Sequence, residues 1–100
     1  MPLTRIDLQE GFTGDTVTLR LNGEEIFHEA GVKTRLQSGF ARIIPVESST
    51  QAAAIEIYLA ERSLSAKFDV DAPGTVFVGI SVEPGGTFTH KASTQQFGYV

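Results

Sequence analysis

Two histidines, His28 and His90, are the residues in this sequence best suited to metal binding or acid–base catalysis. A zinc site needs further ligands at a suitable spacing, and the sequence has neither a His-Glu-x-x-His motif nor a close pair of histidines. The absence of cysteine also excludes thiolate catalysis, cysteine zinc sites and disulfides. We therefore predict no metal or other cofactor, and we expect His28 to be a hydrogen-bonded residue near the end of a sheet.

The other motifs that could carry chemistry are incomplete. Residues 69–74 (DVDAPG) begin like a calcium loop, but Pro73 occupies the third ligand position and Ile80 the position of the bidentate glutamate. The nucleophile elbow of serine hydrolases, Gly-x-Ser-x-Gly, is absent. Residues 83–86 (EPGG) lack the lysine of a phosphate-binding loop and instead predict a hairpin turn. The sequence therefore favours a protein that is not an enzyme.

Charge and hydropathy exclude several kinds of partner. The net charge is −4 and the basic residues are scattered, whereas binding to nucleic acid or an anionic membrane needs clustered positive charge. The longest apolar runs are far shorter than the roughly 18 residues of a membrane-spanning helix. The first residues, MPLTRIDLQEGF, do not resemble a signal peptide. We accordingly expect a cytoplasmic protein that binds neither nucleic acid nor membranes.

Short segments in which apolar and polar residues alternate are the elements that must position any functional site. At 100 residues the chain predicts one domain, residues 1–100. Turn signals recur about every 8–12 residues between segments rich in Val, Ile, Thr and Phe, as expected for a sandwich or barrel. The sequence thus predicts an all-β antiparallel sandwich of about seven to nine short strands, with Greek-key connections. The expected core is formed by Ile6, Leu8, Val17, Leu19, Leu21, Ile26, Ile55, Ile57, Leu59, Leu64, Phe68, Val70, Val76, Val78, Ile80 and Val82.

The segment from about 51 to 61 has two interpretations. Its alanines favour a helix, which would make the fold α+β, and Thr50 could cap that helix. The alternation in IEIYL (residues 55–59) favours a strand, which we prefer.

The Asn22-Gly23 pair predicts a hairpin with a two-residue loop. That loop places Arg20 opposite Glu25, a favourable cross-strand ion pair, and Val17 opposite His28. His28 would then lie on the core side of the sheet, and Phe27 on the polar side.

Three aromatic residues fall opposite the main hydrophobic rows of their strands: Phe27, Tyr58 and Phe77. Gly79 shares the face of Phe77 and marks a flat spot where another group can approach. Either a second layer covers these aromatic residues, or they stay open and bind a protein, a second copy or a sugar.

The apolar end of the chain contains Phe97 and Tyr99, which we expect to dock on the sandwich or on a neighbouring subunit. The strand that follows Pro73-Gly74, taken with the Asn22-Gly23 hairpin, is similar to segments of small bacterial β-sandwich modules. These are the prealbumin-like carboxypeptidase-regulatory and PEGA-type families, and the resemblance implies a β-sandwich. We expect its strands to be arranged as a Greek key or in an immunoglobulin-like or prealbumin-like way.

Three functional hypotheses follow. The preferred one is a non-catalytic module that binds a protein partner or forms a homo-oligomer. Its binding residues would be among Phe27, Tyr58, Phe77, Phe97 and Tyr99. The alternatives are a sandwich that binds a carbohydrate or other small ligand, and a small enzyme that uses His28 or His90 with carboxylates.

Overall fold

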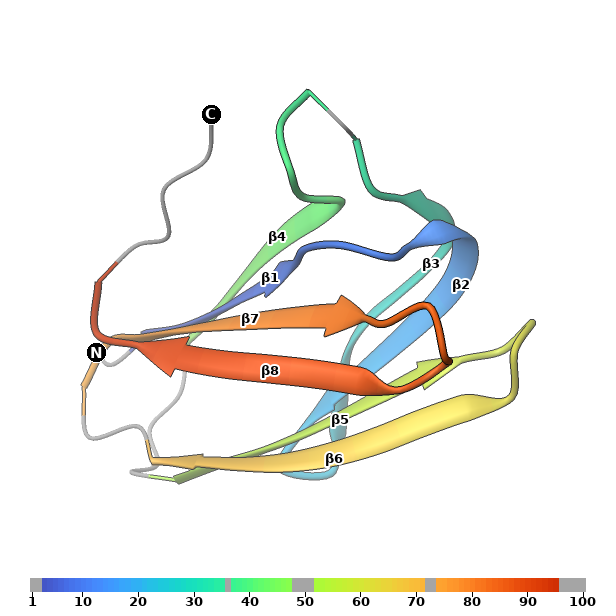
Figure 1. Ribbon diagram of the computed structural model, residues 1–100. Helices are drawn as coiled ribbons and strands as arrows, with labels where there is room; N and C mark the ends of the chain where they lie inside the picture. The colour runs from blue at the N-terminus through green and yellow to red at the C-terminus, as the bar shows by residue number, and fades with distance from the viewer. Residues whose placement is uncertain (1–2, 36, 48–51, 72–73, 96–100) are drawn as a thin grey trace.

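Eight β-strands form two stacked sheets in the computed structural model (Figure 1). The structure describes residues 3–35, 37–47, 52–71 and 74–95. The strands of that part of the chain are β1 (Leu3–Leu8), β2 (Thr13–Leu21), β3 (Glu24–Lys33), β4 (Arg42–Glu47), β5 (Ala52–Leu59), β6 (Leu64–Asp71), β7 (Val76–Val82) and β8 (Phe88–Ser93).

The strands are ordered β4-β1-β7-β8 in one sheet, here called sheet A, and β3-β2-β5-β6 in the other, sheet B. The chain passes between the sheets four times, after β1, β3, β4 and β6. All pairings are antiparallel except the one between β1 and β7, which is parallel. The predicted all-β sandwich is thus confirmed, with one parallel pair that alternation could not reveal.

The ambiguous segment is a strand and not a helix, because β5 pairs with β2 on one side and β6 on the other. Pro45 lies in β4, an edge strand, where its missing N–H costs no ladder hydrogen bond. Within the described ranges, no helix is long and apolar enough to cross a membrane.

The core lies between the two sheets, and alternation identifies most of it. Of the predicted core residues, Ile26, Leu64 and Phe68 are only partly buried, and the others are buried. The structure adds five buried residues that the sequence prediction omitted: Phe12, Val32, Ala41, Ile44 and Ala53.

The first hairpin departs from its predicted register. Asn22 and Gly23 both have positive φ, and Arg20 faces Glu25 as expected. The pairing then shifts, so that Leu19 faces Phe27 and Thr18 faces His28, with Ile26 as the extra residue of a β-bulge. A one-residue shift reverses the faces of the residues beyond it. The predictions that His28 lies on the core side and Phe27 on the polar side are therefore wrong.

A buried ion pair fastens one end of sheet B. Arg62, in the turn between β5 and β6, contacts both carboxylate oxygens of Asp15 at 2.9 Å. Its guanidinium also donates to the carbonyl of Gly11 and the hydroxyl of Thr13. Because the Asp15 side chain is only 4 % exposed, these bonds replace the water that the carboxylate loses on folding.

Candidate functional site

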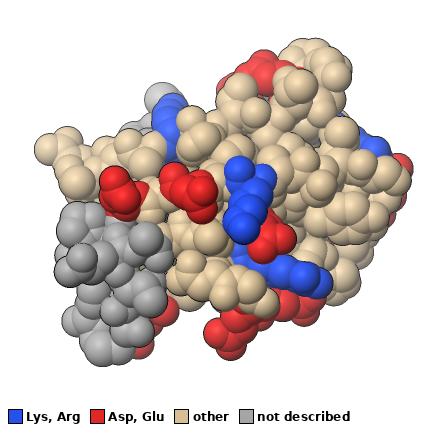
Figure 2. Space-filling view, turned by 90° about the horizontal axis from the view of Figure 1, so that it is seen from below, with Lys and Arg blue, Asp and Glu red and all other residues tan. Residues whose placement is uncertain are grey.

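Four charged residues form a line across the outer face of sheet B, and we call them the charged row. Glu25 of β3 faces Arg20 of β2, Arg20 faces Glu56 of β5, and Glu56 faces Lys67 of β6. Acidic and basic residues thus alternate over all four strands. Figure 2 shows blue and red side chains following one another across this face.

The register prediction for Arg20 and Glu25 is confirmed, but their side chains do not form the expected ion pair. The ion pairs among the described residues are instead Arg5–Asp7, Arg42–Glu29 and Arg62–Asp15. The charged groups of the row are therefore spaced along the face and not closed onto one another.

A second line of polar residues runs beside the charged row, and we call it the tyrosine row. It consists of His28, Thr18, Tyr58 and Ser65, which face one another in that order from β3 to β6. The Oγ1 of Thr18 and the Nδ1 of His28 are hydrogen-bonded at 2.8 Å. Tyr58 is 44 % exposed, and with Ile43 it is one of two large hydrophobic side chains that are exposed in the described part of the chain.

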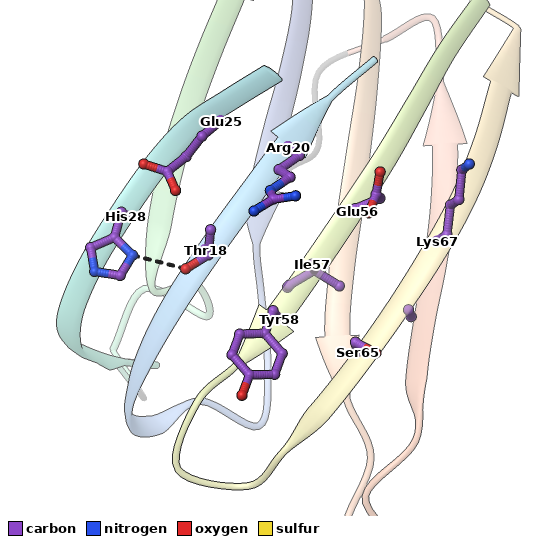
Figure 3. Close-up of a pocket in the computed structure, with 10 residues that line it drawn as sticks. Thr18, Arg20, Glu25, His28, Glu56, Ile57, Tyr58, Ser65 and Lys67 are labelled. Carbon is purple, nitrogen blue, oxygen red and sulfur yellow. Dashed lines mark hydrogen bonds between the residues drawn. The ribbon is translucent and has the colours of Figure 1, made fainter. Parts of the chain in front are cut away.

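The two rows line an open groove of about 650 Å³, to which parts of Ile57 and Ala66 also contribute (Figure 3). This volume lies within the range of small-molecule sites. The groove offers an aromatic ring, an imidazole, three hydroxyls, two cations and two carboxylates. Its chemistry suits recognition of a partner that carries charges of both signs.

Two structural features, strand alternation and a β-bulge, place these side chains on one face. Alternation in β5 turns Ile55, Ile57 and Leu59 towards the core, so that Glu56 and Tyr58 face outwards. In β3 the bulge at Ile26 is needed as well, because without it the histidine would point inwards.

The predicted aromatic site residues do not share a surface. Phe27 is partly buried against the core, which corrects its predicted position, whereas Tyr58 lines the groove. Phe77 lies in sheet A, beneath Arg5, whose guanidinium carbon is 5.3 Å from the ring centroid. Phe97 and Tyr99 lie outside the described residues. Of the three predicted binding residues that the structure describes, only Tyr58 lines the groove.

The two histidines belong to different sheets. His28 lines the groove, while His90 of β8 stacks on Phe68 of β6, with ring centroids 4.0 Å apart. Neither forms an ion pair with a carboxylate of the described residues. No group of three or more metal-ligating side chains occurs in that part of the chain.

Two carboxylates near the ends of the strands, Glu29 and Glu61, have lowered pKa values. The hydrogen bond from the Arg42 side chain lowers the pKa of Glu29, and this contact joins β4 of sheet A to β3 of sheet B. Hydrogen bonds from the Thr16 side chain and backbone lower the pKa of Glu61. Both carboxylates serve as structural acceptors, because each holds two strands or a strand and a turn together.

Sequence reasoning missed most of the groove. The outward positions of Glu56, Ser65 and Lys67 were readable from alternation, but nothing in the sequence joined them to His28. Their alignment depends on the pairing of β2 with β5, which brings residues about 40 positions apart in the chain side by side.

Fold and site together define a small all-β domain of two sheets with an open, mixed-charge groove on one sheet face. Comparisons with protein families, with curated proteins and with solved structures give no match to this chain. The functional inference therefore rests on the geometry of the groove.

Proposed function

We propose that this chain is a non-catalytic protein-interaction module, and that the outer face of sheet B is its binding surface. The observation that carries the proposal is the exposure of Tyr58, 44 %, inside a groove framed by charged residues. Tyrosine and arginine are enriched among the residues that dominate protein interfaces. The aligned charges add selectivity, because they stabilise only a complex with a partner whose opposite charges lie at matching positions.

Among the described residues, the face lacks the groups that catalysis by its best candidate pair would need. Thr18 and His28 are the pair nearest to a nucleophile and a base, since their side chains are hydrogen-bonded. A working dyad also needs a third group to orient the imidazole and donors to stabilise an oxyanion. Among the described residues, no carboxylate contacts His28, so the pair lacks the orienting acid.

A sugar is the second candidate ligand, because an exposed aromatic ring beside hydroxyl and carboxylate groups can stack on a pyranose. Tyr58, with Thr18, Ser65 and Glu56 around it, supplies that combination. Quenching or a shift of tyrosine fluorescence with soluble oligosaccharides, lost in Tyr58→Ala, would favour this alternative over a protein partner.

Site-specific photo-crosslinking tests the proposed function. A benzoylphenylalanine replaces Ser65, which is exposed at the end of the tyrosine row, and a control chain carries it at the exposed Thr87, before β8. We expect irradiation of cells that make the full chain to give protein adducts at position 65 and far fewer at 87. Tyr58→Ala should reduce the adducts at 65. Equal adduct formation at both positions, or none at 65, would overturn the proposal.

A further inference from the structure

The charged row is complementary to itself when it is read backwards. From β3 to β6 its charges run negative, positive, negative, positive: Glu25, Arg20, Glu56, Lys67. Reversing the order exchanges every acidic position for a basic one. The row carries two charges of each sign and is neutral, although the whole chain has a net charge of −4. The charges of two such rows can therefore meet as opposite pairs, without repulsion between like charges in the rows.

One symmetric arrangement uses this property. When two copies meet face to face, a two-fold axis that lies between them, parallel to the strands and midway between β2 and β5, reverses the strand order. Glu25 then lies opposite Lys67 of the second copy, and Arg20 opposite its Glu56. The axis generates each contact twice, which makes four ion pairs of opposite charge in an isologous interface. A two-fold axis parallel to the row would instead set each residue against itself, with like charges facing.

The tyrosine row fits the same arrangement. Because the axis is parallel to the strands, it keeps the position of each residue along the strand direction and reverses only the order of the strands. Each residue therefore faces the residue at the same height on the strand that mirrors its own in the order β3-β2-β5-β6. Tyr58 of one copy then lies over Thr18 of the other, and His28 over Ser65. The hydroxyl and methyl of a threonine accept a tyrosine ring without steric conflict, and the groove of about 650 Å³ provides the space. Aligned sheets of this kind pack with a mutual rotation of about 30°.

We infer that the partner of the proposed binding face is a second copy of this chain, docked through the charged and tyrosine rows about that two-fold axis. The inference rests on the proposed function and specifies its partner. Four strands spaced about 4.8 Å apart, over about 25 Å of their length, give a face that buries on the order of 1,000 Å² in total. An interface of that size, held by exposed charges, forms a weak dimer that salt dissociates.

Charge-changed chains give a sharp test. An acidic variant, Arg20→Glu with Lys67→Glu, carries four negative charges in the row. A basic variant, Glu25→Lys with Glu56→Lys, carries four positive charges. We expect sedimentation equilibrium to show dimers of the unmodified chain, and each variant alone to associate at least about tenfold more weakly. An equimolar mixture of the two should recover association to within about threefold of the original.

A swapped variant controls for changes within one chain. Arg20→Glu with Glu56→Arg puts like charges side by side in the row, yet keeps opposite charges facing across the proposed axis. This variant should still dimerise, and circular dichroism of all variants checks that each remains folded. Monomers of the unmodified chain at millimolar concentration, or a mixture no more associated than its components, would overturn the inference. If either contradicting result were found together with photo-crosslinks from position 65 to a different protein, the proposed binding face would be supported. Only the inference of self-association would then be wrong.

Discussion

His28 of β3 faces Thr18 of β2, and their Nδ1 and Oγ1 atoms lie 2.8 Å apart. An unshifted hairpin would instead set the histidine against Val17, within the core. The bulge at Ile26 accounts for the difference, since it moves Phe27, His28 and Glu29 by one position relative to β2. The same bulge turns Phe27 inwards and brings an imidazole into the groove.

The two aromatic side chains on either side of this sheet should differ in their effect on stability. Phe27→Ala removes a ring that packs against the core, and we expect it to lower the free energy of unfolding by about 2 kcal/mol. Tyr58→Ala removes a ring that is 44 % exposed and lies outside the core, so it should cost less than about 1 kcal/mol in the monomer. Urea unfolding at low protein concentration measures both. A larger loss of stability for Tyr58→Ala than for Phe27→Ala would contradict the position of the bulge.

The two arginine–carboxylate pairs that fasten the ends of strands should also differ. Arg62→Ala leaves the buried carboxylate of Asp15 without its partner, and we expect a loss of about 2–3 kcal/mol. Arg42→Ala breaks a pair whose side chains are 34 % and 43 % exposed, so the loss should stay below about 1 kcal/mol. Thermal and urea unfolding of the two variants provide the comparison. Equal losses would show that the Arg62 contacts do not hold the turn.

Stability should fall in acid partly through Glu61. Its pKa is lowered in the folded protein, chiefly by the hydrogen bond from the Thr16 side chain, so its carboxylate stabilises the fold at neutral pH. That contribution is present above the ordinary value of 4.5 and is lost as the pH falls through the lowered pKa. Glu61→Gln should therefore be less stable than the unmodified chain at pH 7, and the difference should shrink below pH 4.5. Unfolding midpoints across this range measure the effect, and a difference that grows in acid would contradict it.

Substitution of two glycines with positive φ, Gly11 and Gly14, should distinguish the cost of backbone strain from the cost of a steric clash. A Cβ on Gly11 would lie 1.9 Å from the carbonyl oxygen of Val82, whereas one on Gly14 would meet nothing within 4 Å. Gly14→Ala should cost about 1–2 kcal/mol from its backbone conformation alone. Gly11→Ala should cost clearly more, because the loop before β2 must also move away from β7. Denaturant unfolding of both variants decides this, and similar losses would show that the loop yields freely.

The sequence predicted most of the fold because one physical signal, burial on one side of a strand, governs most of it. Alternation placed Val17, Leu19, Ile57 and Val78 in the core and distinguished strand from helix in β5. Phe12 was missed because it precedes the first residue of β2, outside any alternating run. The parallel pairing of β1 with β7 left no local trace, since it joins strands about 70 residues apart.

The candidate site was less predictable. Tyr58 was recognised as an outward aromatic residue, but Phe27 and Phe77 were grouped with it although they belong to the core side and to the other sheet. A bulge changes side-chain direction without a diagnostic residue type, and Ile26 resembles any other strand isoleucine. The charged row depends on pairings between distant strands, which composition and spacing do not encode.

The binding face is tested most directly by amide chemical shifts recorded while the concentration of the unmodified chain is raised. We predict progressive shifts at Thr18, Arg20, Glu56 and Tyr58, and their reversal in about 1 M salt, where charges are screened beyond about 3 Å. Residues on the outer face of sheet A, such as Lys91 and Thr89, should keep their positions. Shifts confined to sheet A, or no dependence on concentration at all, would contradict self-association through the groove.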